Sequence, residues 1–128
     1  MAIKIFIVDD EASIVESLAE ILESVGYEVT TATSGGEAIN KAKQVNPEIL
    51  LSDVLMPAMN GFELALRIKD ALPNCRLILF SGQASTAQLA QQAIQSFTRK
   101  GYRFELLPKP LHPDVLLKKL EQSLTNVP

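Results

Sequence analysis

The chain has 128 residues, of which 47% are hydrophobic and 21% charged, and this is typical of one soluble globular domain. Its formal net charge is −3, whereas a nucleic-acid-binding domain is expected to show a basic excess, so we expect no direct nucleic-acid binding by this chain. Cys75 is the only cysteine, which excludes an internal disulfide.

No apolar run approaches the ~20 residues that a membrane-spanning helix needs. The first ten residues, MAIKIFIVDD, run from an apolar segment directly into acids, unlike a signal peptide. We therefore expect a cytoplasmic protein without membrane contact.

Five short apolar runs alternate with five amphipathic patterns along the chain. The runs cover 3–8, 27–31, 49–51, 77–80 and 102–107. The first, third and fourth are almost entirely apolar, which is typical of strands covered on both faces. Apolar residues recur at helical spacing over 14–25, 38–45, 62–68, 89–97 and 115–124. This alternation predicts a parallel sheet with right-handed crossovers, in an open doubly wound α/β sandwich.

Several helix ends carry local signals. Four segments fit or approach the capping box: Ser13-x-x-Glu16, Ser34-x-x-Glu37, Asn60-x-x-Glu63 and Ser85-x-x-Gln88. Gly26 and Gly101 stand where helices are expected to end, and Pro113 suits the first turn of the last helix.

Polar residues follow the predicted strands, and in such sheets ligands bind outside the carboxyl ends of the strands. The sequence places Asp9-Asp10-Glu11, Asp53, Ser81 and Lys109 after the first, third, fourth and fifth strands. Each alone has a structural explanation as a helix cap, a turn residue or a surface lysine. Their coincidence at four of five strand ends instead predicts a site that accepts a phosphoryl group.

The chemistry follows from these residue types. Crowded carboxylates resist joint ionisation, and a divalent cation such as Mg²⁺, which prefers oxygen ligands, removes that conflict. A carboxylate beside the ion can attack phosphorus and form an aspartyl phosphate. A lysine and a hydroxyl can then stabilise the phosphoryl oxygens.

With these motifs in this order, the chain closely resembles the receiver domain of bacterial two-component response regulators, of the chemotaxis-regulator type. The motifs are VDDE at 8–11, DVLMPAMNG at 53–61, SG at 81–82 and KP at 109–110. The resemblance implies one receiver domain over 1–128. It also implies a flavodoxin-like three-layer fold, with five helices and a five-stranded parallel sheet in the order 2-1-3-4-5.

By this resemblance, Asp53 is the phospho-acceptor of a phosphorelay. Asp10, Asp53 and the backbone carbonyl of Leu55 would hold Mg²⁺ directly, and Asp9 would hold it through water. Ser81 would turn its hydroxyl toward the phosphoryl group. Lys109 would pair with Asp53 before phosphorylation and with the phosphoryl group afterwards, and the Lys109–Pro110 bond is expected to be cis.

The family's phosphoryl donor is a phosphohistidine on a sensor histidine kinase or a histidine phosphotransfer protein. The one histidine, His112, is interpreted as a loop or helix-cap residue. The resemblance implies no enzyme activity beyond the domain's own phosphorylation and dephosphorylation. The fourth helix, fifth strand and fifth helix would form the face that contacts an unknown downstream protein, and they are a candidate homodimer surface.

Two departures from the family pattern concern that face. Leu106 stands where the family usually has Tyr or Phe, whose ring packs in or out as the hydroxyl at the position of Ser81 moves. This aromatic switching is therefore either weakened or partly taken over by Phe104, on the same side of the predicted strand. The segment between Ser81 and Lys109 is longer than usual, and 77–98 has no charged residue. A solvated Gln/Ala helix and an altered output surface both explain this.

Two other functions could use the same acids. An Mg²⁺-dependent phosphatase with an aspartyl-phosphate intermediate usually carries DxD after its first strand and a cap insertion, and the sequence has neither. A pseudo-receiver that binds partners without phosphorylation is disfavoured by the intact acids, Ser81 and Lys109. Because the sequence contains no effector domain, a single-domain regulator and the receiver part of a longer protein both stay open.

Overall fold

The computed structural model describes residues 2–82 and 87–125, and within them the helices and strands alternate as predicted. The strands are β1 (Lys4–Val8), β2 (Glu28–Ala32), β3 (Ile49–Asp53), β4 (Arg76–Ser81) and β5 (Glu105–Pro108). The helices are α1 (Ala12–Ser24), α2 (Gly35–Val45), α3 (Gly61–Ala71), α4 (Ala87–Lys100) and α5 (Pro113–Thr125).

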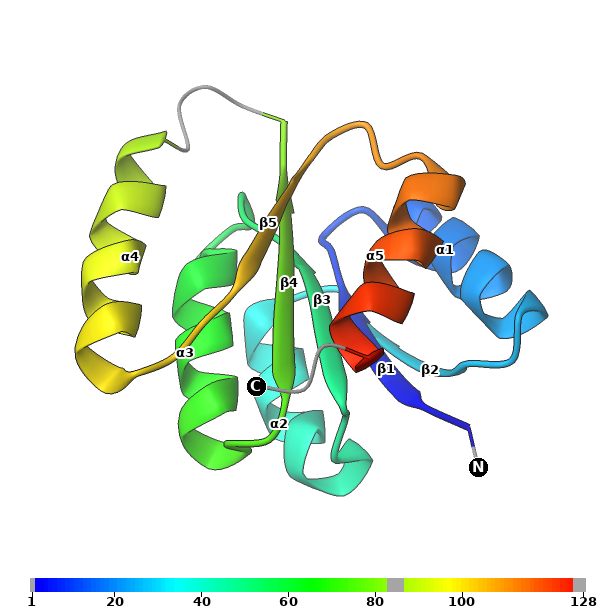
Figure 1. Ribbon diagram of the computed structural model, residues 1–128, viewed down its shortest axis with the longest axis horizontal. Helices are drawn as coiled ribbons and strands as arrows, with labels where there is room; N and C mark the ends of the chain where they lie inside the picture. The colour runs from blue at the N-terminus through cyan, green and yellow to red at the C-terminus, as the bar shows by residue number, and fades with distance from the viewer. Residues whose placement is uncertain (1, 83–86, 126–128) are drawn as a thin grey trace.

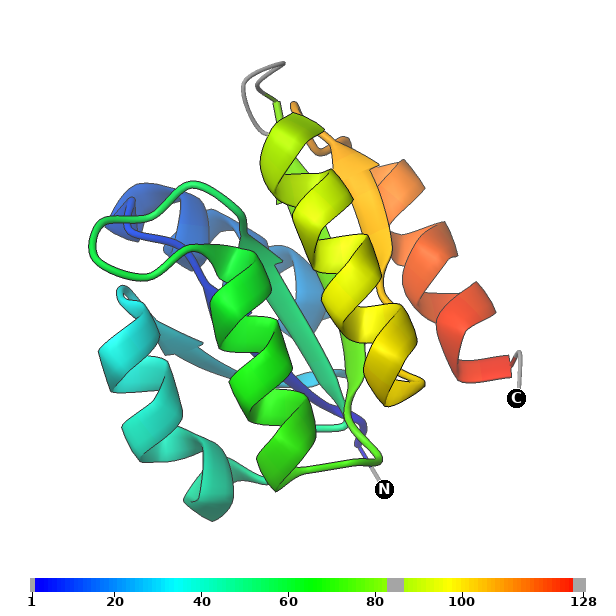
Figure 2. The same cartoon turned by 90° about the vertical axis from the view of Figure 1, so that its left-hand side faces the viewer.

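All strand pairs are parallel, and the sheet has the order β2-β1-β3-β4-β5. Helices α1 and α5 cover one face of this sheet, and α2, α3 and α4 cover the other (Figures 1 and 2). The predicted doubly wound, flavodoxin-like sandwich with strand order 2-1-3-4-5 is therefore confirmed.

The sheet is buried on both faces because alternate residues of its strands enter two separate cores. Phe6, Leu50 and Leu79 pack with α2, α3 and α4, whereas Ile7, Leu51, Ile78 and Phe80 pack with α1 and α5. Burial on both faces explains why these strands read as continuous apolar runs. It also holds the carboxyl ends of the strands, where polar side chains follow, in a fixed arrangement.

The fifth strand begins later than predicted, at Glu105 rather than at residue 102. Gly101 has a φ of +73°, and the N–H of Tyr102 donates to the carbonyl of Phe97 at 2.8 Å, so Tyr102 still belongs to the turn that ends α4. Pairing with β4 starts with Glu105 opposite Ile78. Phe104 therefore lies just before the strand, but on the predicted side, because it packs in the same core as Leu79, which pairs in register with Leu106.

The capping predictions were confirmed for α2 and α3 but not for α1. The side chains of Ser34 and Asn60 accept from the N–H groups of Glu37 and Glu63. At α1 the N-cap is Glu11, whose carbonyl accepts from the N–H of Val15, and its side chain makes no capping hydrogen bond. Ser13 therefore lies inside the first turn.

The other residues predicted at helix ends lie where they were expected, with one outside the described residues. Gly26 and Gly101 follow the ends of α1 and α4 with positive φ values, and Pro113 is the first residue of α5. The predicted cap at Ser85 lies outside the described residues. Across the described ranges, no helix is both long enough and apolar enough to cross a membrane.

Candidate functional site

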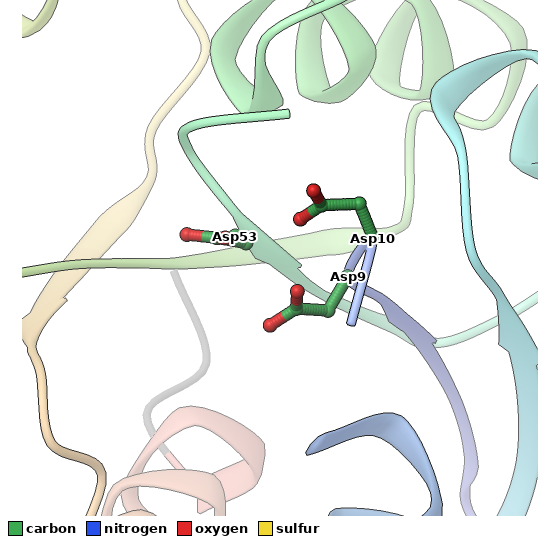
Figure 3. Close-up of side chains that lie close together, drawn as sticks. All are labelled: Asp9, Asp10 and Asp53. Carbon is green, nitrogen blue, oxygen red and sulfur yellow. The ribbon is translucent and has the colours of Figure 1, made fainter. Parts of the chain in front are cut away.

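Three carboxylates meet at the carboxyl edge of the sheet. Asp9 and Asp10 follow β1 directly, and Asp53 is the last residue of β3, so the parallel pairing of these strands brings the acids to one edge. One oxygen from each carboxylate lies within 4.8 Å of the others. Figure 3 shows the three residues close together, with the side chains of Asp9 and Asp10 extending on the side of Asp53. The predicted convergence of these acids is therefore present.

Asp9 is the deepest member of the cluster and is fully buried. Its Oδ1 accepts from the N–H of Glu11 at 3.0 Å, but its Oδ2 has no hydrogen-bond partner among the described residues. Burial, with the neighbouring charge of Asp53 adding to it, raises the pKa of Asp9 to about 6. A buried carboxylate oxygen without a donor is costly unless a cation or a proton satisfies it.

Lys109 provides the positive charge at the same edge. Its Nζ lies 3.1 Å from Oδ1 of Asp53, whose side chain is 7% exposed, while the lysine side chain is 32% exposed. The backbone N–H of Lys109 donates to the carbonyl of Ser81 at 3.1 Å, which ties the lysine to the end of β4. The Lys109–Pro110 bond is cis, as the resemblance implied.

These groups surround an open cleft of about 200 Å³. Its lining residues are Asp10, Glu11, Asp53, Leu55, Ser81, Gly82 and Lys109. All the residues predicted from the strand ends thus lie in the cleft, except for Asp9, which is buried beneath it. His112 lies directly before α5 and its carbonyl accepts from the N–H of Leu116, in agreement with its interpretation as a helix-cap residue.

The loop from β3 to α3 holds Asp53 by a close backbone approach at Gly61. The N–H of Gly61 donates to the carbonyl of Val54 at 2.8 Å, and a Cβ at position 61 would lie 2.2 Å from the carbonyl oxygen of Asp53. Sequence reasoning quoted this glycine as part of a motif without giving it a role. Its position eight residues after the acid, at the start of a helix, was the available signal.

Sequence reasoning also missed Phe80 and gave Gly82 no role beyond its place in the SG motif. Phe80 is fully buried, and the Nζ of Lys109 lies over its ring at 5.3 Å from the centroid. A Cβ at Gly82 would lie 2.8 Å from the Cβ of Lys109, so the absence of a side chain there leaves room for the lysine stem. Neither contact could be read from a pattern of apolar residues.

Phe104 and Leu106, the residues of the altered aromatic position, differ in their surroundings. The ring of Phe104 packs edge-on against Phe62 and Phe97, with centroids 5.4 Å and 4.8 Å apart. Leu106 is 42% exposed on β5. Phe104 is therefore anchored between α3 and α4.

The fold and the cleft define a flavodoxin-like α/β domain with adjacent acids after β1, an acid at the end of β3 and a lysine after β5. A family model described as response regulator receiver domain matches residues 5–121. The chain belongs to the receiver domain family of two-component response regulators.

Individual relatives agree with this assignment. The chemotaxis protein CheY of Thermotoga maritima is 32% identical, and the match covers 95% of this chain and 98% of that protein. A CheY-like receiver domain protein from Methanospirillum hungatei JF-1 superposes with a TM-score of 0.83 at 31% identity, over 97% and 94% of the two chains.

The DNA-binding transcriptional regulator NtrC of Klebsiella pneumoniae is 32% identical over 94% of this chain, and the chain spans 24% of that protein's length. Similarity to NtrC therefore concerns one part of a longer regulator.

Proposed function

We propose that the chain is one receiver domain over 1–128 that accepts a phosphoryl group on Asp53 in an Mg²⁺-dependent phosphorelay. The observation that carries the proposal is the contact of Lys109 with Asp53 at 3.1 Å beside two further carboxylates. The donor would be the phosphohistidine of a sensor histidine kinase or of a histidine phosphotransfer protein. A cytoplasmic location fits such partners.

The residues of the cleft fit a magnesium ion. Mg²⁺ binds few carboxylates and retains several waters, and three carboxylates within 4.8 Å offer such a donor set. The buried Oδ2 of Asp9, which has no partner in the described part of the chain, fits an acceptor for a water that the ion would hold. Asp10, Asp53 and the carbonyl of Leu55 would hold the ion directly and Asp9 through water. When bound, Mg²⁺ neutralises charge on the transferring phosphoryl group.

The chain's own residues then perform the transfer. A carboxylate oxygen of Asp53 attacks phosphorus, the P–N bond to the donor histidine breaks, and the electron pair of that bond stays on the imidazole. Lys109 shifts its ammonium from the carboxylate to a phosphoryl oxygen, because the charge now lies there. The hydroxyl of Ser81, at the end of β4 in the same cleft, donates to another phosphoryl oxygen.

The face formed by α4, β5 and α5 would bind the downstream partner. This face exposes large apolar side chains: Ile94 on α4, Leu106 on β5 and Val115 on α5 are 52%, 42% and 52% exposed. Figure 2 shows α4, β5 and α5 side by side, and exposed apolar side chains on neighbouring elements are typical of protein contacts. The partner would be a downstream protein or a second copy of the chain.

Intact-protein mass spectrometry tests the proposal. The protein is incubated with Mg²⁺ and acetyl phosphate, and Asp53→Asn serves as the control because it keeps the size of the side chain. We expect the wild type to gain the mass of one phosphoryl group, and neither the variant nor a sample with EDTA to gain it.

Two other outcomes would replace the proposal. If the wild type gains no mass and does not bind beryllofluoride, the chain is a pseudo-receiver. If it hydrolyses an external phosphate ester over many turnovers, the cleft is that of a phosphatase.

A further inference from the structure

Three neighbouring strands place an aromatic ring between Asp53 and the strand that Lys109 follows. Asp53 on β3 pairs in register with Phe80 on β4, and Phe80 pairs with Leu107 on β5. Neighbours in register point to the same face of a sheet. Lys109 lies two residues beyond Leu107, so the ring of Phe80 lies between the end of β5 and Asp53.

The contacts of Lys109 agree with this path. Its Nζ lies 3.1 Å from the Oδ1 of Asp53 and 5.3 Å from the centroid of the Phe80 ring, within the ~6 Å at which a cation is attracted to a ring face. Phe80 is fully buried in the core under α1 and α5, whereas the Lys109 side chain is 32% exposed, so the ring side of this contact is shielded from water. Attraction between a cation and a ring is stronger where the groups are desolvated.

Gly82 also lies close to the lysine stem. A Cβ at Gly82 would lie 2.8 Å from the Cβ and 3.6 Å from the Cγ of Lys109. The start of the stem thus lies against a backbone without a side chain, and its ammonium lies over a buried aromatic ring. A free lysine side chain has many rotamers, and these two contacts restrict them.

We propose that Phe80 is a positioning residue for phosphoryl transfer, whose ring face holds the ammonium of Lys109 at Asp53. The inference rests on the proposed function and extends it to a residue outside the cleft lining. The ring stays in place while the partner of the ammonium changes from a carboxylate to a phosphoryl oxygen. Phe80 thereby keeps the lysine within reach of both partners.

Packing alone would also explain a buried phenylalanine, so the test must change the ring's charge distribution and leave its shape. Replacement of Phe80 by phenylalanines with one, two and three ring fluorines weakens the negative face stepwise at nearly constant volume. The readout is the initial rate of Asp53 phosphorylation by acetyl phosphate at saturating Mg²⁺. The same series at Phe6, a fully buried ring in the core on the other face of the sheet, is the matched control.

We expect the rate to fall stepwise along the Phe80 series, by roughly two- to fivefold in total, which corresponds to the loss of a cation–π contact. The Phe6 series should leave the rate unchanged, and thermal unfolding should be equal in both series. A flat Phe80 series, or equal losses in both series, overturns the proposal.

A second measurement does not depend on phosphorylation and separates a failure of this inference from a failure of the proposed function. In the metal-free protein, the ring current of Phe80 should move the Hε resonance of Lys109 upfield of the other lysines, and Phe80→Leu should remove that shift. Absence of the upfield shift in the wild type overturns the positioning role. If the shift is present but the wild type gains no phosphoryl group, the proposed function fails and the ring contact stands.

Discussion

At the scale of single residues, Gly61 decides whether the backbone of Asp53 can take its position. A Cβ at residue 61 would lie 2.2 Å from the carbonyl oxygen of Asp53 and 2.9 Å from the Cα of Val54, both backbone atoms. We predict that Gly61→Ala lowers the free energy of unfolding by about 2 kcal/mol or more, since the β3–α3 loop must shift. The variant should also accept phosphoryl groups more slowly, because the shift moves Asp53.

The matched control is Gly36→Ala, at an exposed position of α2 where a Cβ meets nothing within 4 Å. There the exchange should raise the free energy of unfolding by up to about 1 kcal/mol, because alanine favours the helix. Urea titrations of both variants measure the difference. Equal effects at the two positions would contradict the steric argument.

Asp9 gives a pH-dependent prediction, again for a single residue. Burial raises its pKa from 3.8 to about 6, so between these values the folded protein binds more protons than the unfolded chain. The contribution of Asp9 to the free energy of unfolding therefore falls as pH rises from 3.8 to 6. Without metal, Asp9→Asn should become more stable than the wild type across this window and keep its advantage above pH 6.

Urea titrations of the wild type and Asp9→Asn at several pH values test this prediction. The difference between their free energies of unfolding removes the pH dependence that the other carboxylates contribute to both proteins. Added Mg²⁺ should stabilise the wild type more than the variant. A difference that does not change with pH would show that Asp9 titrates normally.

At the scale of elements, the contact between α3, α4 and the segment before β5 bears on the missing aromatic at Leu106. Movement of Phe104 would break two edge-on contacts, each worth about 0.5–1.5 kcal/mol beyond burial. We predict that Phe104 keeps both ring contacts in the beryllofluoride-bound protein, as seen by NOEs to Phe62 and Phe97. Loss of these NOEs on activation would instead support Phe104 as a substitute switch.

Substitutions should report the same difference between the two side chains. Phe104→Leu is expected to lower the free energy of unfolding by about 1–3 kcal/mol, because it removes both ring contacts. Leu106→Ala, at a position that is 42% exposed, is expected to cost less than about 1 kcal/mol. Equal costs would indicate that Phe104 is not anchored.

Element positions were predictable where the strands are buried on both faces. Buried Ile and Leu residues marked β1, β3 and β4 to within a residue or two. The start of β5 was predicted three residues too early, because the turn at Gly101 keeps Tyr102 in contact with α4, and Phe104 in contact with α3 and α4. A tertiary contact between aromatic rings there outweighs the local preference for a strand, and one sequence does not reveal such a contact.

At the scale of the whole molecule, the cleft was predictable because parallel strands bring their carboxyl ends to one edge. That rule alone places Asp10, Asp53, Ser81 and Lys109 together, as the structure does. The burial of Asp9 and the path of Lys109 over Phe80 were not predictable, because they depend on side-chain packing across three strands. The domain thus combines a predictable set of reactive groups with supporting contacts that only the fold reveals.

The central claim, that Asp53 is the phospho-acceptor, is tested most directly by trapping the acyl phosphate with borohydride. After reaction with acetyl phosphate and Mg²⁺, reduction converts a phosphorylated aspartate into homoserine, and peptide mass spectrometry then locates the changed residue. The account predicts homoserine at position 53 only, and none when Mg²⁺ is withheld. Homoserine at Asp9 or Asp10, or unmodified Asp53 in a protein that has gained a phosphoryl group, would contradict it.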